Sequence, residues 1–257
     1  MKKKIYYLAG LPRAGNTLLS SILNQNPKVK VSPNSLLGSI AYSIFLLKQN
    51  SIFENFPDHK TLDNLIKKIF EHYYDNTKAE IIFERSCWGT VPNLKLLKDY
   101  FEPNPKFLLL NRPIIEIIAS FIKVKKRGTP EAVVKNLMNE NNGKLIQDIR
   151  SARNIVKTEQ NYLMIEYDDL VNKTKESVEK IYKYFNLPKF KHDFSNLKQY
   201  NFNDVKYNDD VLDFDLHTIR TDKIKKQKYK ISDYLSEELI IKLKEYNIYV
   251  PSNYRGI

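Results

Sequence analysis

The feature that most constrains the fold is a strand, a tight loop and a helix within residues 5–26. Residues 5–10 form a β-branched and aromatic run, which predicts a buried strand. A turn with Gly and Pro follows, and residues 16–26 have the apolar spacing of a helix. In such a unit the backbone N–H groups of the loop converge with the positive end of the helix dipole. The sequence therefore predicts an anion site, of the kind that binds phosphate.

The loop differs from the phosphate-binding loop of ATP and GTP hydrolases, which reads Gly-x-x-x-x-Gly-Lys-Ser/Thr. Here the chain reads Gly10-Leu-Pro-Arg-Ala-Gly15-Asn16-Thr17, so Asn16 stands where that motif has Lys. The cation lies inside the loop instead, at Arg13, where a guanidinium can bind two oxygens of a phosphate or sulfate group at once. This difference argues against an ordinary nucleotide hydrolase.

The stretch Pro-Arg-Ala-Gly-Asn-Thr-Leu resembles the 5′-phosphosulfate loop of sulfotransferases, which commonly reads Pro-Lys/Arg-Ser-Gly-Thr-Thr. These enzymes use 3′-phosphoadenosine 5′-phosphosulfate (PAPS) and release 3′-phosphoadenosine 5′-phosphate (PAP). Ala14 replaces a Ser of the family pattern and removes its hydroxyl, and Asn16 replaces a Thr. With Arg13 stabilising the leaving phosphate, the resemblance implies that the donor is bound by Arg13, Ala14, Gly15, Asn16, Thr17 and Leu18.

A second segment carries the resemblance further. Residues 107–110 are an unbroken apolar run, which predicts a central parallel strand covered on both faces. Arg112 follows this strand and Ser120 lies eight residues later, as in the family segment that binds the 3′-phosphate of PAPS. A phosphate monoester needs several charge-assisted donors, and a guanidinium supplies two. The residues alone leave an alternative, in which Arg112 pairs with Glu116 at a helix start and Ser120 is a small buried helix residue.

Three further segments match the family in order, and each has a plainer alternative. The predicted strand over residues 81–84 ends at Arg85, where relatives have a basic residue near the transferred group. Tyr167 follows another predicted strand, in a stretch that resembles the family's Tyr-Glu-Asp-Leu segment and implies a place near the nucleotide. Arg220 and Lys226 belong to a basic stretch that resembles a nucleotide-clamping segment, although a solvated charge run is its alternative.

The acceptor base is the point at which the family pattern fails. In relatives it is a Glu shortly after the first helix or a His after a strand that ends in Lys-Thr. Here those places hold a Pro-Asn pair at residues 33–34 and Cys87, which are not conventional bases. Glu84 is the first substitute because it ends a strand beside Arg85, although an ion pair or an outward-facing carboxylate is its alternative. The other substitutes are His59 and His217.

The order of elements predicts an α/β fold with three layers, in which a mostly parallel central sheet is flanked by helices, as in P-loop-containing nucleotide hydrolases. Ligands of such sheets bind beyond the carboxyl ends of the strands. The helical block over residues 35–78 is either a lid on the acceptor side of the loop or a packing layer. Strands are predicted over residues 5–10, 29–31, 81–84, 107–110 and 162–166. Helices are predicted over residues 16–26, 35–48, 62–70, 92–101, 114–126, 177–185 and from 236, with a loop over 51–60 and a long helical stretch over 131–158 interrupted near 141–143.

Length and residue types limit the other possibilities. The 257 residues suffice for one large domain over residues 1–257. The sequence has no apolar run of membrane-spanning length and no signal-peptide pattern, so we expect a soluble, cytoplasmic protein without a membrane partner. One cysteine and four scattered histidines show no metal-ligand spacing, so we expect no metal.

A formal net charge of +12 raises a rival of another class, a basic protein that uses the loop to bind a nucleic-acid phosphate. The chain shows no helix-turn-helix, zinc-finger or aromatic RNA-binding signature, which argues against nucleic acid as a partner. A second rival is a P-loop kinase, which is disfavoured by the missing loop Lys. The resemblance, closest in layout to tyrosylprotein and carbohydrate sulfotransferases, implies sulfuryl transfer from PAPS to a hydroxyl or amine of a small-molecule, glycan or peptide acceptor. The oligomeric state stays open.

Overall fold

A parallel sheet of five strands forms the centre of the structure, a computed structural model that describes residues 3–55, 58–125, 128–199, 208–209, 216–217 and 224–249. Its spatial order is β2-β3-β1-β4-β5. The strands are β1 (Lys4–Leu8), β2 (Val29–Val31), β3 (Ile81–Arg85), β4 (Phe107–Asn111) and β5 (Tyr162–Glu166). Because β1 lies between β3 and β4, the loop that follows β1 is next to the carboxyl ends of both neighbours.

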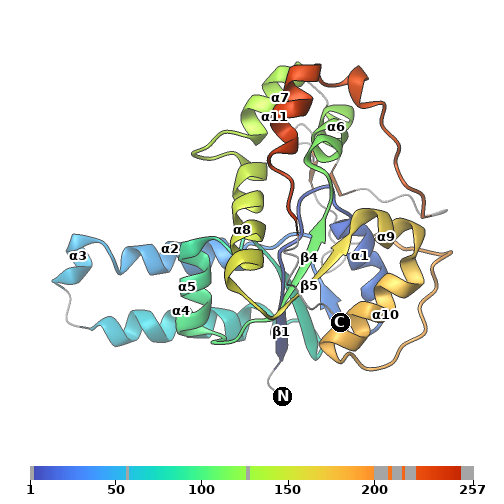
Figure 1. Cartoon of the computed structure of the whole chain (residues 1–257). Helices are drawn as coiled ribbons and strands as arrows, with labels where there is room; N and C mark the ends of the chain where they lie inside the picture. The colour runs from blue at the N-terminus through green and yellow to red at the C-terminus, as the bar shows by residue number, and fades with distance from the viewer. Residues whose placement is uncertain are drawn as a thin grey trace.

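Helices cover the sheet on both faces and at its carboxyl end (Figure 1), which confirms the predicted three-layer α/β fold. One face carries α1 (Asn16–Leu23), α9 (Tyr167–Asn172) and α10 (Thr174–Phe185), and the other carries α5 (Val91–Tyr100) and α8 (Lys144–Thr158). Where β4 leads into α6 (Ile114–Val124), the short η2 (Ile231–Asp233), α7 (Pro130–Leu137) and α11 (Glu237–Lys244) gather. In the part of the chain that is described, no helix is long and apolar enough to cross a lipid bilayer.

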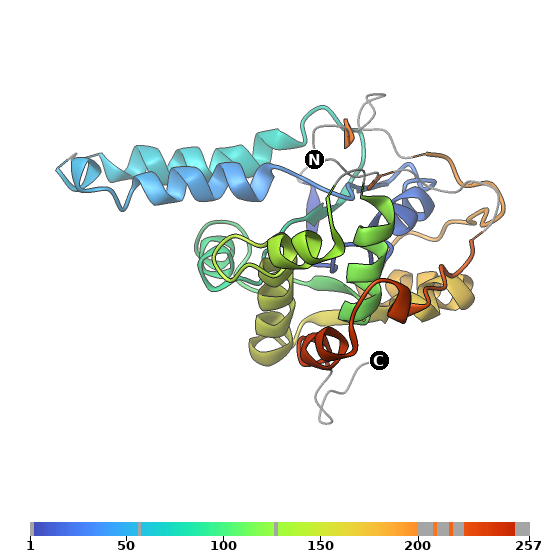
Figure 2. The ribbon, with the colours of Figure 1, turned by 90° about the horizontal axis from the view of Figure 1, so that it is seen from above.

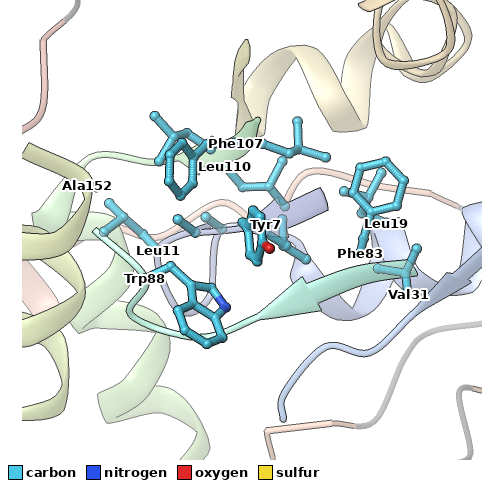
Figure 3. Packing of buried hydrophobic residues seen from close by; sticks show 14 of the residues in the cluster. Tyr7, Leu11, Leu19, Val31, Phe83, Trp88, Phe107, Leu110 and Ala152 are labelled. Carbon is cyan, nitrogen blue, oxygen red and sulfur yellow. The ribbon is translucent and has the colours of Figure 1, made fainter. Parts of the chain in front are cut away.

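The core is built from aliphatic and aromatic side chains of the sheet and of the helices that cover it (Figure 3). The β3 and β4 strands are buried along their whole length, as expected of interior parallel strands. The Tyr7 ring of β1 meets Trp88 edge-on, with ring centroids 5.6 Å apart, and lies 5.9 Å from Phe107. Edge-to-face pairs of this kind add to the hydrophobic burial of the rings. Trp88 thereby anchors the segment that follows β3.

The block predicted over residues 35–78 is a projecting arm rather than a cover over the loop (Figure 2). It consists of α2 (Leu37–Leu47), α3 (Ser51–Glu54) and α4 (His59–Tyr73), with α2 and α4 packed side by side. The inner end of the arm adjoins the segment after β3, where Gly38 of α2 lies against Ser86 and Trp88, and the Phe70 ring of α4 lies 5.4 Å from the Trp88 ring. The arm therefore borders the carboxyl end of β3 and does not close over the loop between β1 and α1.

The predicted loop over residues 51–60 is wrong, because α3 and the start of α4 lie within it. Both helices have side-chain caps at their N-termini. The Asn50 side chain accepts a hydrogen bond from the Ile52 backbone N–H at 3.0 Å, and the Asp58 side chain accepts one from Thr61 at 3.1 Å. Asn and Asp are favoured at this position because they satisfy backbone donors that lack a partner within the helix.

The long helical stretch predicted over residues 131–158 is divided into α7 and α8. The break falls at residues 138–143, where the sequence places Asn141-Asn142-Gly143, so the predicted interruption is confirmed. The short α9 was not predicted, and α10 begins three residues before the predicted start at residue 177. In both cases the sequence at the start of the helix shows no apolar periodicity that would predict it.

Candidate active site

The loop between β1 and α1 has the backbone geometry of an anion-binding turn. Arg13 and Gly15 have positive φ angles of 58° and 96°. Gly15 immediately precedes α1, and a Cβ added there would lie 2.9 Å from a methyl group of Leu170. Because the first N–H groups of a helix have no acceptor within it, this end of α1 is suited to an anion. Of the other predicted loop residues, Ala14 is buried and Thr17 and Leu18 are partly exposed.

Asn16, which stands at the position of the usual phosphate-loop Lys, braces the loop from inside. Its side-chain amide donates to the Leu11 carbonyl at 2.7 Å, and its Oδ1 lies directly over Gly10. Asn16 is buried, so its side chain supports the turn rather than extending toward a phosphate. The side chain of Asn16 is thus engaged within the loop, between Leu11 and Gly10.

Arg13 joins three parts of the molecule that are far apart in sequence. Its Nε donates to the Ser120 hydroxyl at 3.1 Å, and its Nη1 donates to the Leu216 carbonyl at 2.8 Å. The carbonyl of Arg13 in turn accepts a hydrogen bond from Arg112 Nη1 at 2.9 Å. The structure thus brings together Arg13, Arg112 and Ser120, and these contacts hold the strained backbone of Arg13 in place.

Arg112 is held on several sides and is only 2% exposed. Its Nε and Nη2 donate to one carboxylate oxygen of Glu116 at 3.1 and 3.0 Å, so the helix-start ion pair that the sequence left as an alternative does form. The guanidinium also stacks on Tyr167, with 4.0 Å from its carbon to the ring centroid, and lies 5.4 Å from the Tyr229 ring. Cation–π contacts of this kind orient a guanidinium without consuming its donors. Sequence reasoning missed Tyr229, which carries no motif.

Of the three residues predicted to contact the nucleotide, the structure describes Tyr167 and Lys226. Tyr167 lies at the site, with its ring against Arg112 and beside Gly15. Lys226 forms an ion pair with Asp168 at 2.5 Å, and this hydrogen bond raises the pKa of Lys226. Arg220, the other predicted clamp residue, lies outside the described residues.

Arg85 lies next to the loop between β1 and α1. Its Nη2 donates to the Gly10 carbonyl at 3.0 Å, and the same nitrogen is 3.7 Å from Asp148 Oδ2. Arg85 is 4% exposed, so its charge is buried at the point where β3 ends beside β1. A guanidinium in this position is suited to contact an anionic group held by the loop.

Glu84 has the wrong surroundings for a base that meets an acceptor. It is fully buried, and the Tyr74 hydroxyl donates to its carboxylate. Burial raises the pKa of Glu84 to about 8, although the Ser35 hydroxyl and the Arg85 charge act in the opposite direction. At neutral pH the carboxyl is therefore mostly protonated, and the geometry does not favour its predicted role.

The two candidate histidines lie on different parts of the molecule. His59 begins α4 at the outer end of the arm, away from the loop (Figure 2). His217 follows Leu216, whose carbonyl Arg13 contacts, and its Nδ1 is 2.6 Å from Asp209 Oδ1. Burial alone would raise the pKa of Asp209, but the hydrogen bonds from His217 and the backbone lower it. His217 is thus next to the residue that Arg13 contacts.

A cluster that sequence reasoning missed surrounds Cys87, at the end of β3. The Cys87 thiol donates to Asp148 Oδ1 at 2.8 Å, and Lys144 Nζ lies 3.9 Å from Asp148 Oδ2. Burial, together with the charge of Asp148, raises the pKa of Cys87 to about 12, so it stays a thiol. Helical spacing places Lys144 and Asp148 on one face of α8, but nothing in the sequence links that face to β3. Within the described residues, no group of three His, Cys, Asp or Glu side chains is arranged to bind a metal ion.

Comparison with known proteins identifies the family of this chain. The family model described as "Sulfotransferase family" matches residues 7–192. The chain belongs to the sulfotransferase family. No curated protein matches it in sequence. Among solved structures, it is similar to the sulfotransferase domain of a Synechococcus olefin synthase, with a TM-score of 0.56, 17% identity and coverage of 95% of each chain. It is also similar to a mouse sulfotransferase in complex with PAP, with a TM-score of 0.57, 13% identity and coverage of 96% of this chain and 83% of the other.

Proposed function

We propose that this sulfotransferase moves a sulfuryl group from PAPS to a hydroxyl or amine group of an acceptor. The observation that carries the proposal is the meeting of Arg13, Arg112 and Ser120 around one loop. Two separate phosphate sites within one cluster suit a nucleotide that carries phosphate at both its 3′ and 5′ positions. An ordinary nucleoside triphosphate would leave the second of these sites unused.

On the donor side, we assign a part to most of the predicted residues. Loop N–H groups from Gly15 to Thr17 would bind the 5′-phosphate at the start of α1. Arg112 and Ser120 would bind the 3′-phosphate, with Arg112 giving up part of its pairing with Glu116. Tyr167 and Lys226 would lie near the nucleotide, and the part of Arg220 stays a prediction from the sequence.

Catalysis then requires cations where negative charge develops. Sulfuryl transfer is an in-line displacement at sulfur, in which charge grows on the bridging oxygen of the leaving phosphate. Arg13 would neutralise that oxygen, and Arg85 would contact the sulfuryl oxygens from the end of β3. Family members need no metal ion for this step. The kind of acceptor, whether small molecule, glycan or peptide, and the cytoplasmic location stay predictions from the sequence.

Calorimetry with PAP tests the proposal directly. We expect PAP to bind without metal at micromolar or better affinity, about −8 kcal/mol. ATP with Mg²⁺ and a short oligonucleotide serve as comparison ligands, because they represent the kinase and nucleic-acid rivals. Absence of PAP binding, or tighter binding of ATP with Mg²⁺, would overturn the proposal.

A further inference from the structure

Asp148 presents a buried carboxylate oxygen that lacks a donor. The side chain is 5% exposed, and its Oδ1 accepts a hydrogen bond from the Cys87 thiol. Among the residues that the structure describes, Oδ2 has no hydrogen-bond partner, although Arg85 and Lys144 lie at ion-pair distances of 3.7 and 3.9 Å. Leaving a buried acceptor without a donor is unfavourable, so such an atom calls for a partner from elsewhere. A hydroxyl group of a bound molecule is a partner of the right kind.

The carboxylate is held in place by the way α8 docks on the segment after β3. Ser151 and Asn154 follow Asp148 at helical spacing and face the same segment. The Gly89 N–H donates to the Ser151 hydroxyl at 2.9 Å, and the Asn154 amide donates to the Gly89 carbonyl at 2.8 Å. A Cβ at Gly89 would lie 2.2 Å from the Ser151 carbonyl, so the two backbones touch. This contact fixes Asp148 relative to residues 85–89.

We propose that Asp148 is the base that accepts the proton of the acceptor hydroxyl, an inference that rests on the proposed function. In the step, the acceptor O–H bond breaks and its proton passes to Asp148 Oδ2, while the acceptor oxygen forms a bond to sulfur. The bond from sulfur to the bridging oxygen breaks, and its electron pair leaves with PAP. Asp148 occupies the right place because Arg85, its neighbour, contacts the donor loop at Gly10.

The arrangement also explains how the chain works without the family's His at Cys87. The thiol is a donor that orients the carboxylate, so the proton-accepting atom is supplied by α8 instead. Glu84 is fully buried and accepts a hydrogen bond from Tyr74, so it cannot contact an acceptor substrate. His217 lies on the donor side, next to the Leu216 carbonyl that Arg13 contacts.

Lys144 marks the direction from which an acceptor reaches Asp148. Its side chain is 57% exposed, yet its ammonium group is 3.9 Å from both Asp148 Oδ2 and the Cys87 sulfur. The charged side chains of Arg85, Asp148 and Lys144 therefore extend from the buried end of β3 to the solvent. An acceptor that displaces the exposed side chain of Lys144 would place its hydroxyl beside Oδ2.

The test compares two acceptors with the Asp148→Asn enzyme, using phenol and 4-nitrophenol as probes and PAPS as donor. Phenol keeps its proton in mildly alkaline buffer, since its pKa is near that of tyrosine, about 10. 4-Nitrophenol is ionised there and needs no base. We expect Asp148→Asn to lower the rate with phenol by about 10²–10⁴-fold and the rate with 4-nitrophenol by less than about tenfold. PAP affinity, measured by calorimetry, should be unchanged.

Equal losses with both phenols would overturn the inference, because they would show a structural role. Asp99→Asn, the same change in an exposed ion pair of α5, is the matched control. If Asp148→Asn fails to fold, Asp148→Glu replaces it, and a return of the wild-type ratio between the two phenols supports the base. If the wild type binds PAP but uses neither phenol, hydrolysis of PAPS by water is compared, and an unchanged rate in Asp148→Asn overturns the inference. Loss of PAP binding in the wild type is separate, since it overturns the proposed function.

Discussion

The donor side and the acceptor side of this site are built in different ways. On the donor side, Arg13, Arg112 and Ser120 lie on segments that directly follow strands β1 and β4, which are neighbours in the sheet. On the acceptor side, Asp148 comes from α8, and the arm of α2 and α4 projects away from the sheet. Adjacent parallel strands fix the first set through their own topology, whereas the second depends on how helices dock. Donor residues are therefore visible in local sequence, and acceptor residues are not.

The two sides also differ in how their charges are satisfied. Arg112 pairs with Glu116 and Arg13 donates to Ser120, so the donor cations already have partners. On the acceptor side, the described structure leaves Asp148 Oδ2 and Arg85 Nε without hydrogen bonds. A ligand must therefore compete with existing contacts on one side, while it completes missing ones on the other.

On the donor side, the largest effect is expected from Arg13→Ala. If Arg13 stabilises the leaving phosphate, its removal lowers the rate of sulfuryl transfer by about 10²–10³-fold. PAP affinity should fall much less, because only stronger binding of the transition state accelerates the chemistry. Single-turnover transfer to 4-nitrophenol and calorimetry with PAP measure the two quantities. Arg150→Ala, which removes an exposed arginine paired with Glu140, is the control, and equal losses of rate and PAP affinity would contradict the assignment.

The contrast between the two sides explains what the sequence could predict. The strand, loop and helix over residues 5–26 and the pair formed by Arg112 and Ser120 depend on short spacings, which the fold preserves. The direction of the arm could not be predicted, because it depends on packing between α2 and α4. Glu84 was predicted as a base from its place in a strand, but its burial under Tyr74 comes from tertiary contacts. Asp148 was missed because only the docking of α8 brings it to β3.

Arg112→Ala tests whether Arg112 binds the 3′-phosphate on the donor side. Loss of a charge-assisted contact to the 3′-phosphate should weaken the binding of PAP by about 1.5–3 kcal/mol. The binding of adenosine 5′-phosphosulfate, which has no 3′-phosphate, should be weakened less. Since Arg112 also holds the Arg13 carbonyl, some loss is expected with both ligands, and the difference between them is the quantity that counts. Equal losses in calorimetry would show that Arg112 is only a support for the loop.

Glu84→Gln separates stability from catalysis on the acceptor side. The pKa of Glu84 is raised from 4.5 to about 8 on folding, so its contribution to stability is complete below the lower value and is lost as pH rises through the higher one. Against the uncharged Gln variant, the wild type should lose up to about 1.4 kcal/mol of unfolding free energy per pH unit within that window. Urea unfolding at several pH values measures this slope. A large fall in turnover without any slope would instead restore Glu84 as the base.

The smallest effect is expected from Glu116→Gln. This variant tests whether the ion pair between Arg112 and Glu116 lowers the affinity for PAP. Glu116 accepts two hydrogen bonds from Arg112 and places a negative charge beside the proposed 3′-phosphate site. Gln keeps an acceptor oxygen but removes the charge, so PAP should bind about 0.3–1 kcal/mol more tightly, the range typical of a partly exposed ion pair. The gain should shrink in high salt, since screening weakens the repulsion.

Adenosine 5′-phosphosulfate distinguishes this explanation from a general change in the loop, because only PAP should gain affinity. Glu176→Gln, which removes a charge from the first turn of α10, is the matched control. If Glu116→Gln weakens PAP, the ion pair serves to hold Arg112 in its binding position rather than to compete with the phosphate. In that case the donor side would be organised by its acidic residue, and the contrast with the unsatisfied carboxylate of Asp148 would become sharper still.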